Sequence, residues 1–330
     1  MEEFKTDNIF KADEENIKKA AMAIRKGGVV AFPTETVYGL GADGYNPQAC
    51  ARIFEIKERP RFDPLILHAN SAEMACGLFS EVPDKAKILM RKFWPGPLTL
   101  VLPKAAAVPD IVSSGLPTVA VRVPAHPAAL ALIRAADRPV AAPSANKFGR
   151  LSPTAARHVA EQLGRGPEII LDGGRTAVGV ESSIITFHAG HPVLLRAGGL
   201  AAEEIEAALG ETVLRPEPSK GKDALPMAPG CLKKHYAPRA ELRIIKRGTA
   251  VPDGAYSAYI AFSAEPDNAA DYGMVKVLSP SGDLKQAAAN LFYVLHELEN
   301  SGISRIYAEE VPPQGLGLAI MDRLKRGAAK

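Results

Sequence analysis

The sequence predicts an α/β protein with two domains joined by a long linker. In residues 1–210, short apolar runs rich in β-branched residues alternate with segments of helical period. Residues 211–240 show neither pattern, and five prolines fall between Glu211 and Arg239. Residues 241–330 return to alternating strand and helix patterns. A large α/β domain should therefore be followed by a linker and a smaller, separate α/β domain.

Length and composition limit the class of protein. The chain has 330 residues, 47% of them apolar, which suits a globular protein with a sizeable core. No apolar run is long enough to cross a bilayer, and the charged N-terminus, M-E-E-F-K-T-D-N, has no apolar signal core. The three cysteines lie far apart without a C-x-x-C pair, which argues against a disulfide framework and a zinc site. We therefore expect a cytoplasmic protein without a membrane partner, and we assign no metal-ligating residue.

Local signals place the helices of the first domain. Asp13 to Lys26 has a helical apolar period that is closed by Gly27-Gly28. Asn46-Pro47 is an N-cap and first-turn pair for a helix that reaches Ile56. Further helices are expected to start at Ser71 and at Pro83, to span 128–134 and 202–209, and to follow a cap at Ser152-Pro153.

The strands are read from apolar runs bounded by turn residues. In the first domain these runs are 29–33, 65–69, 98–104, 118–124, 140–146, 168–172, 181–187 and 192–196. In the second domain, strands fit 243–246, 256–262, 274–278 and 305–308, and helices fit 284–299 and 318–326.

The stretch from Val29 to Gly41 (V-V-A-F-P-T-E-T-V-Y-G-L-G) organises the first domain. Its strand should end at Pro33, because proline cannot donate to a ladder. The polar trio Thr34, Glu35 and Thr36 follows, and a Gly-rich turn is expected after it. Open α/β sheets bind ligands at the carboxyl ends of their strands, so this stretch could either form a site or be a plain turn.

Polar residues mark the ends of several other strands. Arg122 interrupts an apolar run, and burying it unpaired would be costly, so it should face a polar cavity or a partner. The other polar residues at strand ends are Ser144 and Asn146, then Glu181, Ser182 and Ser183, and finally Arg196. Each of these alone is more often a turn residue, but one crevice could collect the whole set.

Lys57, Arg59 and Arg61 cluster in the stretch from Lys57 to Pro64, a loop that Pro60 and Pro64 stiffen. Cations on a stiff loop suit phosphate oxygens, whereas the alternative is a basic surface loop. The basic excess of the chain lies further on, where residues 211–247 hold nine Lys/Arg against four Asp/Glu. That excess suits either a phosphate-bearing partner or a solvated linker.

Several known catalytic motifs are absent. The chain has no P-loop, no nucleophile elbow and no H-E-x-x-H, and no serine has an evident His/Asp partner. Gly315-Leu316-Gly317 lacks the third glycine of a dinucleotide fingerprint. Direct in-line transfer in an electrostatic pocket is therefore favoured over covalent catalysis.

The motifs as a set resemble the YrdC-domain proteins, and specifically the long two-domain threonylcarbamoyl-AMP synthases. The resemblance covers nearly the whole chain. It rests on P-T-E-T-V-Y-G-L-G (33–41), K-E-R-P (57–60), D-P-L-I (63–66), W-P-G-P-L-T (94–99), V-A-V-R-V-P (119–124), A-P-S-A-N (142–146), D-G-G (172–174), V-E-S-S-I (180–184), L-R (195–196), P-G-C-L-K-K-H-Y-A-P (229–238) and G-L-G-L-A-I-M-D-R (315–323). Two departures are Asp63, where the family usually has Asn, and Cys231, where it often has Met.

The resemblance implies a fold and a domain division. It implies a twisted, open mixed sheet with flanking helices in 1–210, a linker in 211–240 that acts as an active-site lid, and a smaller Rossmann-like α/β domain in 241–330.

It also implies an activity, which is synthesis of threonylcarbamoyl-AMP from L-threonine, bicarbonate and ATP with release of pyrophosphate. Mg²⁺ and basic residues would neutralise the triphosphate. The product would pass to a tRNA threonylcarbamoyl-transferase complex, and weak tRNA binding by this chain is left open.

Carried over by motif, the resemblance assigns site residues. Those matching the threonine side are Thr34, His68, Arg122, Ala142 and Ser182. Those matching the ATP side are Lys57, Arg59, Arg61, Thr118, Ser144, Asn146, Ser152, Arg196 and the linker residue Tyr236. Lys57, Arg59 and Arg196 are the catalytic cations of this set.

Two other functions were weighed. The fold would also suit a non-catalytic module that binds tRNA or double-stranded RNA, although such a module would not need a threonine pocket. Carbamoyl transfer in hydrogenase maturation is disfavoured, because it would need acylphosphatase and zinc-finger regions.

Overall fold

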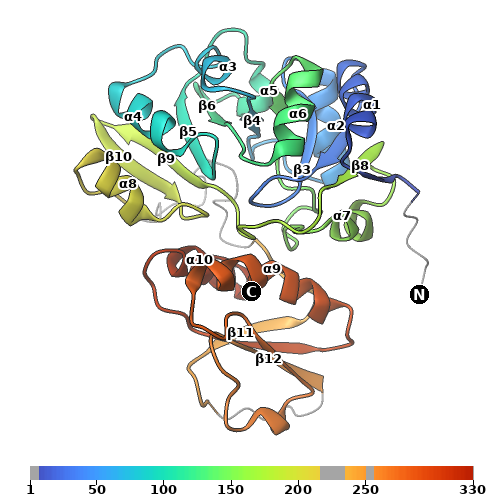
Figure 1. Cartoon of the computed structure of the whole chain (residues 1–330), viewed down its shortest axis with the longest axis vertical. Coiled ribbons are helices and arrows are strands. Elements are labelled where there is room, and N and C mark those ends of the chain that lie inside the picture. The colour runs from blue at the N-terminus through green and yellow to red at the C-terminus, as the bar shows by residue number, and fades with distance from the viewer. Residues whose placement is uncertain (1–6, 216–234, 250–255, 330) are drawn as a thin grey trace.

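The computed structural model describes residues 7–215, 235–249 and 256–329. Within these residues the chain forms two α/β domains, one above the other in Figure 1. This arrangement confirms the predicted fold class. Most of the linker, including Cys231, Lys233 and Lys234, lies outside the described residues.

The first domain is built on a mixed sheet that counts ten strands in the described residues, in the order β1-β8-β2-β3-β7-β4-β6-β5-β9-β10. Its strands are β1 (Ile9–Lys11), β2 (Val30–Phe32), β3 (Gly39–Asp43), β4 (Ile66–His68), β5 (Leu98–Pro103), β6 (Thr118–Arg122), β7 (Val140–Ala141), β8 (Ile169–Asp172), β9 (Ser183–His188) and β10 (His191–Arg196).

Helices cover both faces of this sheet. On one face, α1 and α6 pack with residues of β2, β7 and β8, and a larger core forms on the other face. The helices are α1 (Glu14–Arg25), α2 (Pro47–Lys57), α3 (Ala72–Cys76), α4 (Asp84–Phe93), α5 (Asp110–Ser113), α6 (Pro127–Ala136), α7 (Ala156–Leu163) and α8 (Ala202–Leu209). Asn46 caps α2 as expected, since its side chain accepts from the backbone N–H of Gln48 and Ala49.

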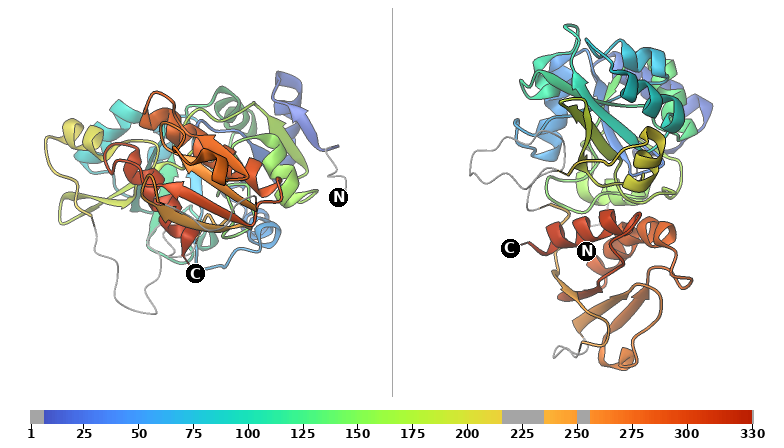
Figure 2. Two further views of the ribbon diagram at one scale, coloured as in Figure 1. Left: turned by 90° about the horizontal axis from the view of Figure 1, so that it is seen from below. Right: turned by 90° about the vertical axis from the view of Figure 1, so that its left-hand side faces the viewer.

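The second domain has a parallel sheet in the order β11-β14-β12-β13, with both of its α-helices on one face. These helices lie between the sheet and the first domain (Figures 1 and 2). The elements are β11 (Glu241–Ile245), β12 (Ser257–Ala261), the 3₁₀ turn η2 (Ala269–Asp271), β13 (Met274–Val277), α9 (Leu284–Glu299), β14 (Arg305–Glu309) and α10 (Gly317–Ala328).

The two domains share an apolar interface. Val37, Leu151 and Val180 of the first domain belong to the same buried cluster as α9 and α10. Gly179 explains the close approach, because its φ is +76° and a Cβ there would lie 2.5 Å from the carbonyl oxygen of Ala288 in α9. Polar contacts also cross this interface, such as the ion pair of Arg150 with Glu299 of α9 at 2.7 Å.

Three local predictions were wrong. Residues 39–43 form β3 rather than a turn, since alternate glycines leave room for Phe32 and Val140 from the neighbouring strands. The predicted strand 140–146 shortens to the two residues of β7, because Pro143 has no N–H for the ladder. Ser152 caps no helix, and α7 begins later, at Ala156.

Four short elements, β1, β3, α5 and η2, were not expected from the sequence. Among the helices of the described residues, none has the length and apolar character of a membrane span.

Candidate active site

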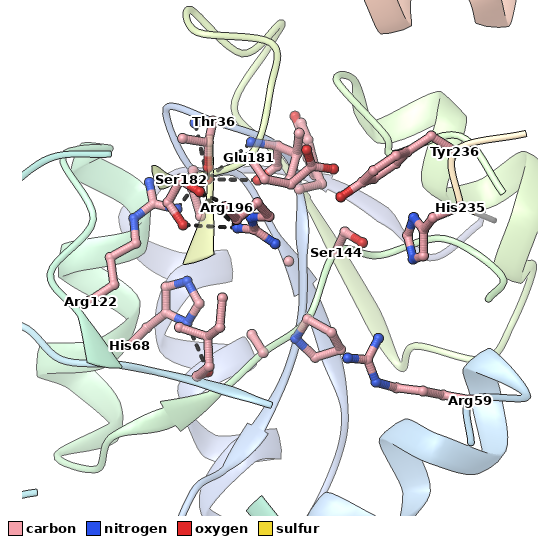
Figure 3. A pocket seen from close by; sticks show the side chains of 17 residues that line it. Thr36, Arg59, His68, Arg122, Ser144, Glu181, Ser182, Arg196, His235 and Tyr236 are labelled. Atoms are coloured by element: carbon pink, nitrogen blue, oxygen red, sulfur yellow. Dashed lines mark hydrogen bonds between the residues drawn. The ribbon is translucent and has the colours of Figure 1, made fainter. Parts of the chain in front are cut away.

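A cavity opens at the edge of the large sheet where β4, β6 and β10 end. Its empty volume is about 520 Å³ with the mouth included. Nine of its lining residues were predicted as site residues: Thr34, Arg59, His68, Arg122, Ala142, Ser144, Ser182, Arg196 and Tyr236. Figure 3 shows Arg122 and His68 on one side and Tyr236 and His235 on the other. The sheet edge therefore collects polar ends of strands that are far apart in sequence.

Arg122 is the last residue of β6 rather than a mid-strand residue, and it is 3% exposed. Its guanidinium lies 2.5 Å from a Glu35 carboxylate oxygen and donates to the Thr36 hydroxyl at 2.8 Å and to the Gly96 carbonyl at 3.2 Å. These contacts satisfy the expectation of a partner and fix the plane of the guanidinium. His68 at the end of β4 lies beside it, and burial, together with the Arg122 charge, lowers the pKa of His68 to about 3.

The polar trio after β2 forms a tight turn at the cavity. The Thr34 hydroxyl donates to the Val37 carbonyl at 2.6 Å and lies 2.8 Å from the Thr36 hydroxyl. The Glu35 side chain accepts from the backbone N–H of Ala125 at 3.0 Å. The turn thus presents fixed hydroxyl and backbone groups to the cavity, which favours the site over the plain turn.

Ser182 and Arg196 lie together at the ends of two paired strands, since Ser182 directly precedes β9 and Arg196 ends β10. The Arg196 side chain donates to the Ser182 carbonyl at 2.9 Å and to the Ser182 hydroxyl at 3.1 Å, and that hydroxyl lies 2.7 Å from the Thr99 hydroxyl. Gly198 permits this arrangement, since a Cβ there would meet the Ser182 carbonyl carbon at 2.3 Å. The buried Arg196 guanidinium is therefore held against the cavity wall by the backbone of Ser182, just before β9.

Lys57 and Arg59 do not lie on a surface loop. Lys57 is the last residue of α2, Arg59 comes two residues later, just after the C-cap Glu58, and both cations are buried. Lys57 Nζ donates to the carbonyls of Ser144 and Asn146, whereas Arg59 pairs with Asp63 at 2.8 Å. Asp63 thus supplies a carboxylate partner for a cavity cation. Burial, with the Arg59 charge as the next cause, lowers the pKa of Lys57.

The described end of the linker packs against the cavity. Tyr236 is 2% exposed, with a φ of +61°, and its ring lies tilted against that of Phe292 in α9, with ring centroids 5.6 Å apart. His235 makes an edge contact with Phe148, and burial lowers the pKa of His235 to about 3. A non-glycine residue in the left-handed region persists only where its surroundings hold it, so this end of the linker is tightly fixed.

Five predicted residues do not line the cavity. Lys57, Asn146 and Ser152 are buried behind its wall, and Arg61 is exposed. Thr118 begins β6 and shares a sheet face with Arg122, four residues or roughly 13 Å away along the strand.

Ile66, Val101, Ala120 and Ile184 form a small apolar cluster on the sheet.

Three further polar residues of the lining were noted in the sequence but were not assigned to a substrate. Thr36, Glu181 and His235 all line the cavity. Glu181 accepts from the Ser152 hydroxyl and from Arg323 of α10. Arg323 ends a run that resembles the family, which was the only sequence signal for it, since local periodicity treats it as an ordinary helix residue.

The cavity has one lining carboxylate, Glu181, and no group of three His, Cys, Asp or Glu residues suited to a metal occurs among the described residues. A divalent ion would therefore have to enter with phosphate oxygens of a substrate.

The buried histidines predict a loss of stability in acid. Burial is the largest cause of the lowered pKa values of two histidines, about 3 for His68 and about 4 for His296. A histidine in the unfolded chain titrates near 6.5. Their contribution is complete above about pH 6.5 and is lost as the pH falls towards 4, because the unfolded chain takes up protons first. The thermal unfolding midpoint should be steady above pH 7 and fall below 6.5, with a shallower fall in His296→Gln. A constant midpoint down to pH 4.5 would contradict this assignment.

Comparisons with known proteins agree with this geometry. The family model described as "Telomere recombination", which covers the Sua5, YciO and YrdC group, matches residues 22–198, and the "Threonylcarbamoyl-AMP synthase, C-terminal domain" model matches 200–329. The threonylcarbamoyl-AMP synthase of Pyrococcus abyssi is 44% identical over 96% of this chain and 95% of its own length. That of Bacillus subtilis is 41% identical over 98% and 95%.

A solved structure, P. abyssi Sua5 complexed with L-threonine, superposes with a TM-score of 0.86 at 42% identity, covering 97% of this chain and 96% of that one. Fold and site therefore define a YrdC-type α/β protein with a second domain packed beside its cavity. The chain belongs to the threonylcarbamoyl-AMP synthase family in its long, two-domain form. The predicted family and enzyme class are confirmed.

Proposed function

We propose that the cavity joins L-threonine, bicarbonate and ATP into threonylcarbamoyl-AMP and releases pyrophosphate. The observation that carries this proposal is one cavity that holds two sets of fixed groups: Arg122 with hydroxyl groups at one side, and two further buried arginines, Arg196 beside Ser182 and Arg59 at the other side. The first set suits the carboxylate and hydroxyl of threonine, and the second suits phosphates. The names of the relatives and the threonine complex of P. abyssi Sua5 support it.

The proposed reaction needs no enzyme nucleophile. The threonine nitrogen adds to the carbon of bicarbonate with loss of water, which gives a carbamate. A carbamate oxygen then attacks the α-phosphorus, the new O–P bond forms, and the bond to the β-phosphate oxygen breaks, so that pyrophosphate leaves with its electron pair. Cations held in a water-poor cavity would stabilise the charge that develops.

In this proposal threonine contacts Thr34, His68, Arg122, the backbone of Ala142 and Ser182. His68 stays neutral because of its lowered pKa, so it can accept or donate one hydrogen bond without adding charge beside Arg122. ATP would run from Arg59 and Arg196 towards Thr118, since an extended nucleotide spans about the length of β6 and the sheet carries apolar side chains for the base.

The remaining assignments are part of the same proposal. Lys57 orders the Ser144–Asn146 segment, Ser152 holds Glu181, and Arg61 would meet ATP only if its loop moved. Mg²⁺ is taken as part of the MgATP substrate. Tyr236 would cover the cavity, with residues 211–240 as the lid. The product would pass to a tRNA threonylcarbamoyl-transferase complex in the cytoplasm.

The test is the purified full-length protein incubated with MgATP, labelled bicarbonate and L-threonine. Pyrophosphate release is expected only when threonine and bicarbonate are both present, with a labelled adenylate as product. Equal release without threonine would reject the proposal. Binding of tRNA or double-stranded RNA with no adenylate would instead favour the non-catalytic RNA-binding module.

A further inference from the structure

Arg323 reaches the wall of the cavity from the second domain. It lies in α10, is 1% exposed, and donates through Nε to a Glu181 carboxylate oxygen at 2.8 Å. The same guanidinium donates to the Ala197 carbonyl and to Asp322, each at 2.8 Å. A charged side chain of the second domain is thus buried against the loop that leads into β9 and against the end of β10.

Both oxygens of the Glu181 carboxylate are occupied. One accepts from Arg323 and the other from the Ser152 hydroxyl, so the carboxylate is fixed at the cavity wall. Burial alone would raise the pKa of Glu181, but the charges of Arg323 and Arg196 and the Ser152 hydrogen bond lower it to about 2. Glu181 is therefore a carboxylate throughout the physiological range.

Arg323 also supports the other side of the cavity. Its guanidinium carbon lies 5.1 Å from the centroid of the Tyr236 ring, a cation–π distance, and Gly327 one turn later allows the Tyr236 carbonyl to approach α10. Glu181 and Tyr236 both line the cavity. One guanidinium therefore connects the loop before β9, which holds Glu181, with the linker and the second domain.

We propose that Arg323 is a positioning residue for the adenylation site, which holds the Glu181 carboxylate and the Tyr236 ring in the places that the nucleotide pocket requires. The second domain then completes the site instead of only securing the linker. Fixing Glu181 on Arg323 matters because the charged carboxylate also holds the Ser152 hydroxyl at the cavity wall, beside Arg196, and a Glu181 that takes up a proton can no longer accept with both oxygens. This proposal rests on the proposed function for its kinetic test.

Removal of the guanidinium should make the site sensitive to pH. Glu181 faces Arg196 of β10, Arg323 of α10, and His235 and Tyr236 of the linker, and Asp322 pairs with Arg323. Without Arg323 the buried carboxylate loses its hydrogen-bonded cation, so its pKa should rise and it should take up a proton as the pH falls. The wild-type protein should show no such change above pH 6.

The test compares Arg323→Met, Arg323→Met with Glu181→Gln, and Arg150→Met from pH 6 to pH 9. Arg150→Met is the matched control, because Arg150 makes another ion pair between the domains, with Glu299 at 2.7 Å, and does not line the cavity. We expect Arg323→Met to lower kcat/KM for ATP at least about tenfold and to add an acid limb to the pH profile. The double variant should lose that limb, and Arg150→Met should keep the wild-type profile.

Two results would overturn the proposal: a wild-type pH profile in folded Arg323→Met, or the same change in Arg150→Met. If Arg323→Met does not fold, Arg323→Lys replaces it, because lysine keeps the charge but cannot make the paired hydrogen bonds of a guanidinium. Arg323→Lys should then lower kcat/KM for ATP by less than the tenfold expected for Arg323→Met. If the wild type binds ATP but makes no adenylate, the proposed function fails and ATP affinity measured by calorimetry decides instead. Arg323→Met should then weaken ATP binding about tenfold, and equal affinities of Arg323→Met and Arg150→Met would reject the positioning role.

Discussion

Replacing Arg122 by alanine should weaken threonine binding at least about tenfold. A charge-assisted bond from a buried guanidinium to a carboxylate contributes about 1.5–3 kcal/mol, and about 1.4 kcal/mol corresponds to a factor of ten in the dissociation constant. Three contacts, to Glu35, Thr36 and Gly96, already orient the group, so little side-chain entropy is lost when a ligand binds. Calorimetric titration with L-threonine measures the effect.

Two controls make this result specific. Arg138→Ala removes an arginine that is half exposed and whose Nε lies as far as 3.9 Å from an Asp43 carboxylate oxygen. Such a weak surface pair contributes little, so threonine affinity should not change. Arg122→Ala with Glu35→Gln removes the carboxylate that the first change leaves without its cation, and it should recover stability but not threonine affinity. A folded Arg122→Ala protein with wild-type threonine affinity would show that Arg122 only neutralises Glu35.

Replacing Lys57 by methionine should lower the free energy of unfolding by about 2–4 kcal/mol and abolish pyrophosphate release. The side chain is 1% exposed, and its loss leaves the carbonyls of Ser144 and Asn146 without a donor, each an unsatisfied group that costs about 1–3 kcal/mol. Methionine keeps most of the volume, which separates the lost hydrogen bonds from a cavity. Chemical denaturation and the pyrophosphate assay measure the two effects.

Lys147→Met is the matched control for this variant. Lys147 pairs with the exposed Glu58 and is one-third exposed, so its replacement should change stability by less than about 0.5 kcal/mol. If Lys57→Met instead kept wild-type stability and lost only ATP affinity, Lys57 would contact the phosphates directly and would not act through the Ser144–Asn146 segment.

The sequence predicted where most elements lie, because the signals for them are local. Asn46-Pro47 predicted the start of α2, and its side-chain oxygen does cap that helix. Pro33 predicted the end of β2, and alternation and helical period placed the strands and helices of the second domain to within a few residues. The glycines of β3 were misread as a turn, since only the neighbouring strands show that close packing requires them.

Local pattern also misjudged the surroundings of several charged residues. Lys57 and Arg59 were expected on a stiff loop, either to hold phosphates or as plain surface cations, yet the chain buries both beside carbonyl and carboxylate partners. Ser152 looked like a helix cap because a proline follows it, but its hydroxyl bonds Glu181 instead. Burial and partners depend on what packs against a residue, and periodicity carries no information on that.

The sequence by itself determined the α/β class, the order of most elements and the set of polar residues that end the strands. The tertiary structure alone decided which of these residues meet. The strand order β7-β4-β6-β5-β9-β10 brings Ala142, His68, Arg122 and Arg196 to one sheet edge, although strand pairing between distant segments leaves no periodic signal. Arg323 and Glu181 are 142 residues apart, and they meet only because α10 packs its apolar face against the first domain.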